Sequence, residues 1–272
     1  MEIFFLGTGA AEGWPGVFCQ CKYCMLARKL GGKNIRTRSS IMYNNELKVD
    51  FPPDTYLHVL KYGLDLGSLK YLLITHTHQD HFYINELLTR RRPYAHLNIN
   101  YPLKIYGNIN VFKVILNRFD KKSDKNIVEP HLLEEWNTYK IGKYEVIPLL
   151  ADHSPEEKCY IYLIMDKNKT ILHGYDTGWF PEETWRKLEN YNLDLAILDC
   201  TNGGINSVKY HMGVNGVIKV REEMISKKIA DKDTIFIATH FSHNGGLLHQ
   251  QLEEKLSKYN IIVAYDGLKI KI

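Results

Sequence analysis

The sequence has few cysteines and lacks long hydrophobic runs. Its 272 residues include five cysteines, an odd number, and three of them fall within six residues, so a disulfide framework is not expected. No stretch approaches the roughly 20 apolar residues of a membrane span. The apolar run at residues 3–6 is too short, and lacks the basic flank, for a signal peptide. We therefore expect a cytoplasmic protein that does not contact a membrane.

The sequence also lacks a large net charge and internal repeats. The net charge is only +4, which suits a phosphorylated substrate as well as it suits nucleic acid. A hydrophobic content of 44% and a charged content of 24% are ordinary for a globular protein, and the chain is long enough to bury a sizeable core. Since no linker or repeat divides the chain, we expect one α/β domain over residues 1–272.

Local patterns predict several elements. Residues 40–51 read as a β-hairpin with Asn44-Asn45 at the turn, and residues 166–169 read as a second hairpin turn. Asp54 is expected to cap a short helix that runs through residue 61 and ends at Gly63. Residues 214–225 are expected to form a longer helix. Arg90-Arg91-Arg92 is a compact positive patch, either a phosphate clamp or a solvated helix end.

A dense group of metal-capable side chains follows one apolar run. Residues 71–74 read as a buried strand, and Thr75-His76-Thr77-His78-Gln79-Asp80-His81 comes next. An extended backbone points His76 and His78 to the same side, because they are two residues apart. Imidazole and carboxylate groups bind zinc, manganese or iron. A solvated histidine-rich turn is the alternative, but four ligands directly behind a buried strand favour a metal site.

Other apolar runs also end in a metal-capable residue. His153 follows residues 144–150, Asp176 follows residues 170–172, and His240 follows residues 234–238. Sites in α/β proteins form outside the carboxyl ends of strands, so we expect these residues to meet at one rim. The complete set is His76, His78, Asp80, His81, His153, Asp176 and His240. Seven ligands exceed the need of one tetrahedral ion and suit two ions about 3.5–4 Å apart that share a carboxylate and hold a hydroxide between them.

This pattern resembles the metallo-β-lactamase superfamily, in which H-x-H-x-D-H is followed by isolated His, Asp and His at strand ends. The resemblance implies an αββα sandwich with two metals at its upper rim. It implies one ion on His76, His78 and His153, a second ion on Asp80, His81 and His240, and Asp176 as the bridge. Asp50 is similar to the first-motif aspartate of the superfamily, although Phe51-Pro52-Pro53 follows it where a glycine is more common.

Two further motifs narrow the resemblance. Cys19, Cys21 and Cys24 give three thiolates where zinc takes four ligands, and Thr239-His240-Phe241-Ser242-His243 carries a second histidine. Both motifs are similar to the PhnP-type phosphoribosyl cyclic phosphate phosphodiesterases of phosphonate breakdown. That likeness implies a structural zinc on Cys19, Cys21, Cys24 and His243, with a zinc knuckle at residues 19–24, and it suggests a homodimer. Three free buried cysteines are the alternative, and the similar knuckle of PqqB leaves the substrate open.

A third motif concerns catalysis. Leu198-Asp199-Cys200-Thr201 followed by Tyr210-His211-Met212 is similar to a segment of the same phosphodiesterases, whose histidine acts on the substrate. His211 is not needed as a metal ligand, and a histidine that titrates near neutral pH suits a general acid. Asp80 is expected to bind metal and to orient the nucleophile. A solvated loop histidine is the alternative for His211.

The sequence therefore predicts a metal-dependent hydrolase that opens a small phosphodiester, such as a phosphoribosyl cyclic phosphate or a 2′,3′-cyclic nucleotide, by attack of the bridging hydroxide. A tRNA 3′-processing ribonuclease shares the histidine cluster but needs a basic docking arm, which the chain lacks, so nucleic acid is not the expected partner. A lactonase or thioesterase would direct the same hydroxide at a carbonyl. A non-catalytic PqqB-like carrier is disfavoured by the complete ligand set.

Overall fold

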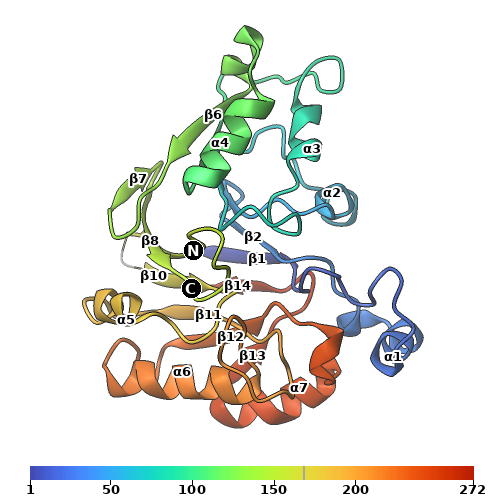
Figure 1. The fold of residues 1–272 in the computed structure, drawn as a ribbon, viewed down its shortest axis with the longest axis vertical. Helices are drawn as coiled ribbons and strands as arrows, with labels where there is room; N and C mark the ends of the chain where they lie inside the picture. The colour runs from blue at the N-terminus through green and yellow to red at the C-terminus, as the bar shows by residue number, and fades with distance from the viewer. Residues whose placement is uncertain (168) are drawn as a thin grey trace.

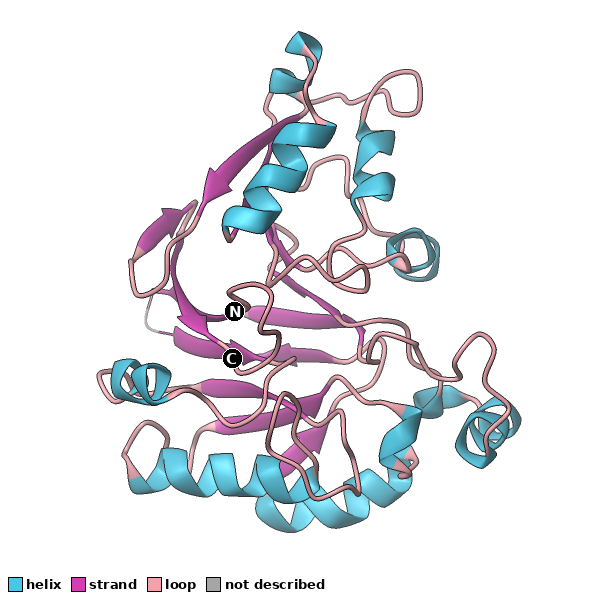
Figure 2. Cartoon of the chain, in the orientation of Figure 1, coloured by secondary structure: helices cyan, strands magenta, loops and turns pink. Residues whose placement is uncertain are grey.

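Two sheets packed face to face form the centre of the molecule, with helices on their outer faces (Figures 1 and 2). The computed structural model describes residues 1–167 and 169–272, and the hairpin turn expected at residues 166–169 includes residue 168, which lies outside the described residues. The layers are helices, sheet, sheet, helices. The predicted α/β sandwich is confirmed.

The first sheet has seven strands in the order β14-β1-β2-β3-β4-β5-β6. They are β1 (Glu2–Gly7), β2 (Ser40–Tyr43), β3 (Leu47–Val49), β4 (Tyr71–Leu73), β5 (Leu103–Gly107), β6 (Val128–Leu132) and β14 (Lys269–Lys271). β2 and β3 form the predicted hairpin around Asn44-Asn45. β14 pairs antiparallel with β1, so the two chain ends lie side by side, and the Ile272 N–H donates to the Met1 carbonyl at 3.0 Å.

The second sheet has seven strands in the order β13-β12-β11-β10-β9-β8-β7. They are β7 (Tyr139–Ile141), β8 (Tyr144–Leu150), β9 (Tyr160–Asp166), β10 (Lys169–Gly174), β11 (Leu195–Asp199), β12 (Ile235–Thr239) and β13 (Ile261–Val263). β10, β11 and β12 are parallel, and β8 runs in the same direction because β9 is antiparallel to both β8 and β10. Their carboxyl ends therefore open onto one edge of the sheet.

Seven α-helices are present in the described part of the chain. They are α1 (Lys22–Leu30), α2 (Thr55–Tyr62), α3 (Ile84–Leu87), α4 (Ile109–Arg118), α5 (Glu182–Leu188), α6 (Val214–Ser226) and α7 (His249–Leu256). α2, α3 and α4 lie on the side of the first sheet, and α5, α6 and α7 lie on the side of the second sheet (Figure 1). None of these helices is both long enough and apolar enough to cross a bilayer.

Alternating side chains along the strands build the layered core. On β4, Leu73 packs between the two sheets, whereas its neighbour Leu72 packs on the outer face among residues of α3 and α4. On the second sheet, Ile197 faces the space between the sheets and Leu198 packs against the side covered by α6. Both faces of the central strands are thus buried, which explains why these strands read as continuous apolar runs rather than as alternating patterns.

The helix predicted after Asp54 is present as α2 and ends at Gly63, which is left-handed at φ +63°. The predicted capping role of Asp54 is wrong. Its carboxylate makes no cap bond and instead accepts from the Arg38 backbone N–H at 2.8 Å and pairs with the Arg38 guanidinium at 3.1 Å. The charge-assisted contact with Arg38 takes the oxygens that would otherwise satisfy the first turn of the helix.

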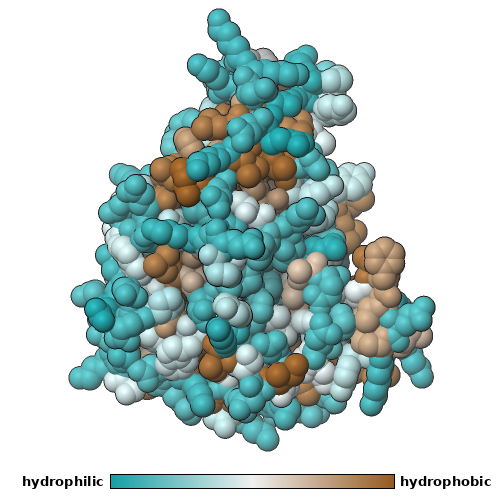
Figure 3. All heavy atoms as spheres, in the orientation of Figure 1, coloured by the Kyte–Doolittle hydropathy of each residue, from teal (hydrophilic) through white to brown (hydrophobic). Residues whose placement is uncertain are grey.

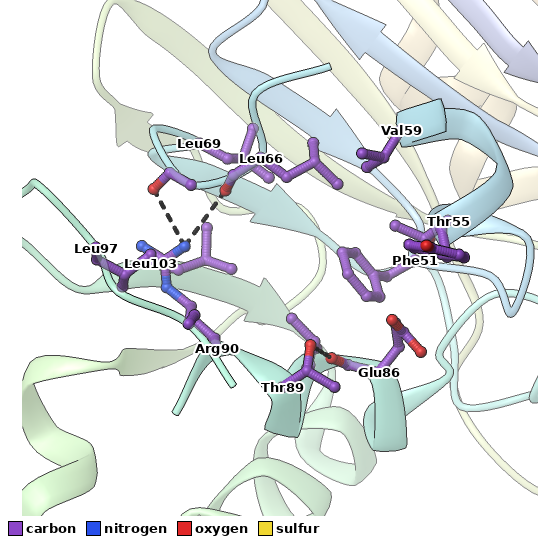
Figure 4. Close-up of a pocket in the computed structure, with 14 residues that line it drawn as sticks. Phe51, Thr55, Val59, Leu66, Leu69, Glu86, Thr89, Arg90, Leu97 and Leu103 are labelled. Atoms are coloured by element: carbon purple, nitrogen blue, oxygen red, sulfur yellow. Dashed lines mark hydrogen bonds between the residues drawn. The ribbon is translucent and has the colours of Figure 1, made fainter. Parts of the chain in front are cut away.

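Two of the three arginines of the predicted positive patch make contacts within the protein. Arg90 is buried, and its guanidinium donates to the carbonyls of Leu66 and Gly67 at 3.3 Å, beside an apolar cavity of about 230 Å³ between α2 and α3 (Figure 4). Arg91 pairs with the Asp124 carboxylate at 2.7 Å. Neither guanidinium lines the cleft that holds the histidine cluster. The phosphate-clamp hypothesis is therefore wrong for these two residues, and so is the solvated helix end.

Candidate metal centre

The ends of four strands bring the predicted ligands together at one cleft of about 330 Å³, with His76 and His81 buried directly behind its lining. The histidine cluster follows β4, while His153, Asp176 and His240 follow β8, β10 and β12. Convergence at a single rim is therefore what the structure shows. The cluster comes from the first sheet and the other three ligands come from the second, so the cleft lies where the two sheets meet.

One group of donors is made by His76, His78, His153 and Asp176, whose ligand atoms all lie within 4.8 Å of one another. The Nε2 atoms of His76 and His153 each lie 3.3 Å from Asp176 Oδ2. His78 Nδ1 lies 2.9 Å from His76 Nε2 and 3.1 Å from His153 Nε2. Three imidazole nitrogens and one carboxylate oxygen directed at one point form a donor set that fits zinc or a similar divalent ion.

A second group is made by Asp80, His81 and His240. His81 Nε2 lies 3.0 Å from Asp80 Oδ2 and 3.0 Å from Asp176 Oδ2, and the Nε2 atoms of His81 and His240 are 3.3 Å apart. Asp176 thus stands between the two groups, as a bridging ligand would. The partition into two ions that the resemblance implies matches these groups.

The charge of the rim gives an independent reason to expect cations. Asp176 Oδ1 is buried and makes no hydrogen bond among the described residues, although His211 Nδ1 lies 3.2 Å away, so a bound cation would stabilise this carboxylate oxygen. Burial alone would lower the pKa of His81, but the carboxylates of Asp80, Asp50 and Asp176 outweigh it and raise that pKa well above its usual value. The residues present therefore fit a centre of two divalent ions.

His211 lies beside this centre. Its Nδ1 is 3.2 Å from Asp176 Oδ1 and 3.3 Å from Asp199 Oδ2, and the side chain is 27% exposed to the cleft. Burial lowers the pKa of His211, but the hydrogen bond to Asp199 and the charges of Asp199 and Asp176 raise it overall, to about 9. Because Nδ1 faces the two carboxylates, Nε2 is the ring atom left to act on a substrate.

The cysteine motif forms a separate donor group. The ligand atoms of Cys19, Cys21, Cys24 and His243 lie within 4.8 Å of one another, with His243 Nδ1 at 3.5 Å from Cys21 Sγ and 3.8 Å from Cys19 Sγ. The backbone N–H of Cys24 helps to lower the pKa of the Cys21 thiol to about 7. Three sulfurs and one imidazole nitrogen form a closed set typical of structural zinc.

Comparison with known proteins decides the family. Residues 55–241, more than two thirds of the chain, match the family model described as the β-lactamase superfamily domain. The chain belongs to the β-lactamase superfamily. The family expected from the histidine motif is thereby confirmed.

Solved structures share this superfamily fold over the whole chain. A diphosphatase of the PhnP family is 22% identical, with a TM-score of 0.77 over 100% of this chain and 97% of that one. Zn²⁺-bound PqqB from Methylobacterium extorquens is 17% identical, with a TM-score of 0.77 over 100% of both chains. The short form of human tRNase Z is 18% identical, with a TM-score of 0.67 over 100% of this chain and 99% of that one. At these identities the likeness shows the fold.

One curated protein also matches part of this chain. An octanoyltransferase from Porphyromonas gingivalis (strain ATCC BAA-308 / W83) is 34% identical over 85 residues. Those residues are 30% of this chain and only 16% of that protein. The chain therefore spans about one sixth of that relative's length.

Several supporting residues of this β-lactamase superfamily site were not assigned a role from the sequence. Thr201 Oγ1 lies 2.8 Å from His240 Nδ1 and donates to Asp199 Oδ2 at 2.7 Å, so Asp199 orients His240 through Thr201. Glu157 accepts from the backbone N–H of Thr77 at 2.9 Å and thereby holds the histidine loop. Asp199 ends β11, and the strand-end position that indicated the metal ligands could have indicated it too.

Three residues at or directly behind the rim have a left-handed backbone. Asp50, Asp176 and His240 have φ values of +60°, +58° and +61°, in the left-handed region that side chains other than glycine adopt at a cost. Each follows the end of a strand, where the left-handed residue turns the chain sharply. The bend lets a buried strand end in a side chain that faces the cleft.

Proposed function

We propose that the protein is a metal-dependent phosphodiesterase that hydrolyses a small phosphodiester, most readily a cyclic one. The observation that carries this proposal is the pair of donor groups in one small cleft, with Asp176 in the first group and 3.0 Å from His81 of the second, and with His211 beside them. Two divalent ions bound there would neutralise the charge of a phosphate and lower the pKa of water held between them. Phosphoribosyl cyclic phosphates and 2′,3′-cyclic nucleotides both belong to this substrate class.

The protein's own residues have defined tasks in this reaction. Asp80 orients the attacking water and accepts its hydrogen bond. As the water oxygen bonds to phosphorus, one P–O ester bond breaks, and His211 Nε2 gives a proton to the oxygen that leaves. Asp199 and Asp176 hold His211 Nδ1 at 3.3 and 3.2 Å, so they fix the ring and favour its protonated form. The attacking water releases a proton to the solvent, and a proton from the solvent then returns His211 to its charged form.

The other functions that share this rim are less well supported. A tRNA-processing ribonuclease requires a basic docking surface, yet Arg90 is buried and Arg91 is paired with Asp124. A carrier without catalysis would not need His211 facing the cleft. A lactonase or thioesterase would use the same water to attack a carbonyl carbon. An assay with both kinds of substrate therefore distinguishes these enzymes from a phosphodiesterase.

A substrate panel tests the proposal. The purified chain, supplied with zinc or manganese, is assayed against bis(p-nitrophenyl) phosphate, a 2′,3′-cyclic nucleotide and a simple lactone. We expect phosphodiester hydrolysis that a chelator abolishes and that added metal restores. A kcat/KM for the lactone above that for every phosphodiester would overturn the proposal, as would tight RNA binding with a steep dependence on salt.

A further inference from the structure

Beyond the metal ligands, the wall of the catalytic cleft is polar but not basic. Glu12, Asn202, Ser242 and Asn244 form this outer wall. Among the described residues that line the cleft, none is a lysine or an arginine. A substrate can therefore place one phosphate at the metal rim, but the wall offers no cation for a second phosphate.

Glu12 adds a negative charge to that wall. Its carboxylate accepts a hydrogen bond from Ser242 Oγ and lies 3.5 Å from His243 Nε2, so the charge is fixed in place between the catalytic rim and the cysteine group. A second phosphate beside it would meet like charge. The amide groups of Asn202 and Asn244, by contrast, suit sugar hydroxyls, since an amide can both donate and accept.

Two basic side chains in this region, Arg38 and Lys209, make contacts with other residues. Arg38 pairs with Asp54 at 3.1 Å, and its Nε donates to the Ala11 carbonyl at 2.8 Å. Lys209 is exposed and holds its Nζ 4.8 Å from the centre of the Tyr210 ring, outside the cleft lining. The Arg38 charge, although it lines the groove next to Glu12, is thus already balanced by Asp54, and Lys209 lies outside the cleft lining.

A second groove shares Glu12 with the cleft and is lined by Val17, Phe18 and Arg38. Phe18 is 96% exposed and Val17 is 71% exposed, which is unusual for such apolar side chains. Apolar atoms are visible on the lobe that carries α1, at the right of Figure 3. An exposed phenylalanine ring at the end of a hydroxyl-binding wall is a platform on which a flat ring can stack.

We propose, building on the phosphodiesterase function above, that the organic part of the substrate is an uncharged, hydroxyl-bearing group that carries an aromatic ring. A nucleoside 2′,3′-cyclic phosphate without any further phosphate meets this description. The cyclic phosphate lies at the metal rim, the ribose faces Asn202, Asn244 and Glu12, and the base packs on Phe18. A ribosyl cyclic phosphate that carries a second phosphate in place of the base is a poor fit.

Three substrates test this inference: adenosine 2′,3′-cyclic phosphate, the same compound with a 5′-phosphate, and glycerol 1,2-cyclic phosphate. We expect the KM of the first to be at least about 5-fold below that of the glycerol compound, because only the adenosine compound has a base to stack on Phe18. We also expect it to be below that of the 5′-phosphate compound, because the second phosphate would meet the charge of Glu12. A lower KM on adding the 5′-phosphate, or equal KM values for adenosine and glycerol compounds, would overturn it.

Variants of the aromatic platform sharpen the test. Phe18→Ala is expected to raise KM for the adenosine compound about 10-fold with little change in kcat, and Phe18→Tyr is expected to restore it. Leu30→Ala, which removes another exposed apolar side chain of the same lobe, is the control and leaves KM unchanged. A Phe18→Ala effect of equal size on all three substrates would contradict a contact with the base.

Calorimetry with adenosine 3′-phosphate separates the two ways of failing. Binding that depends on Phe18, without turnover of any diester, overturns the phosphodiesterase function and retains the ring contact. Turnover without dependence on Phe18 overturns the ring contact and retains the function. If the protein neither turns over a diester nor binds this nucleotide, both proposals are wrong.

Discussion

His81 donates from Nδ1 to Asp50 Oδ2 at 2.6 Å, and both side chains are fully buried. This bond leaves Nε2 of the same ring aimed at Asp80 and Asp176. Asp50 also accepts from the Thr75 backbone N–H at 2.9 Å, so it ties the histidine loop to the end of β3. A ligand whose second nitrogen is bound in this way is oriented before any metal arrives.

Asp50→Asn is predicted to weaken metal binding at the rim by about 10- to 100-fold, because the charge that orients His81 is lost. Asparagine tolerates the left-handed backbone of this position, so the variant should retain the fold. Competition with a chromogenic chelator measures the affinity. Tyr175→Phe, which removes only one neutral donor to the Asp50 carboxylate, is the matched control, and an Asp50→Asn affinity equal to that control would contradict the role.

Cys21→Ser is predicted to remove one zinc ion per chain while the catalytic pair stays bound, since the two donor groups share no ligand. Elemental analysis of the purified variant measures this. Cys159→Ala is the control, because Cys159 is buried outside both groups and its loss should not change the zinc content. Wild-type metal content in Cys21→Ser would contradict the structural site.

His211→Ala is predicted to lower kcat by about 10²- to 10⁴-fold, the usual contribution of a positioned general acid, with the metal content unchanged. Steady-state kinetics and elemental analysis are measured on the same preparation. The donor group Asp176, Asp199, His211 and His240 makes metal binding the competing role for this residue. Loss of an ion in His211→Ala would assign it that role, and unchanged kcat would exclude it from catalysis.

Arg91→Ala is predicted to destabilise the fold by about 2 kcal/mol and to leave KM unchanged, because Arg91 bonds both oxygens of the buried Asp124 carboxylate. Urea denaturation and kinetics provide the two readouts. Arg92→Ala, at an exposed neighbouring position, is the control and should alter neither. If Arg91→Ala raised KM without lowering stability, Arg91 would be assigned to phosphate binding instead.

His58, which lies on α2 and belongs to neither donor group, makes stability depend on pH. Burial, reinforced by the charges of Lys48 and Lys61, lowers its pKa to about 3, while the unfolded chain titrates near 6.5. Below pH 6.5 the unfolded state binds a proton that the folded state refuses, so stability is lost as pH falls, by about 2 kcal/mol at pH 5. Chemical denaturation at pH 7 and pH 5 should show a smaller loss in His58→Gln than in wild type. The exposed His96→Gln should behave as wild type, and an equal loss in all three would contradict the assignment.

Sequence patterns predicted the site better than they predicted the contacts around it. His76, His78 and Asp80 could be recognised because they follow a buried strand in a dense motif. His153 and His240 required only the rule that sites form at the carboxyl ends of strands. Each of these signals is local, and each of these residues could be assigned to the candidate site without knowledge of which strands pair.

Long-range contacts were beyond the reach of such patterns. Asp54 was expected to cap α2, but its carboxylate binds Arg38, which is 16 positions away in the chain. Glu157 holds Thr77 from 80 positions away, and Arg90 turns inward to backbone carbonyls rather than outward to solvent. The pairing of β14 with β1 also joins opposite ends of the sequence. Partners of this kind depend on how the sheets pack.

Metal stoichiometry tests the central claim most directly. We predict three divalent ions per chain by elemental analysis of the folded wild-type protein, two at the rim around Asp176 and one zinc on the cysteine group. A folded chain that binds no more than one ion when divalent metal is in excess would contradict a shared two-metal rim, and the phosphodiesterase proposal would fall with it.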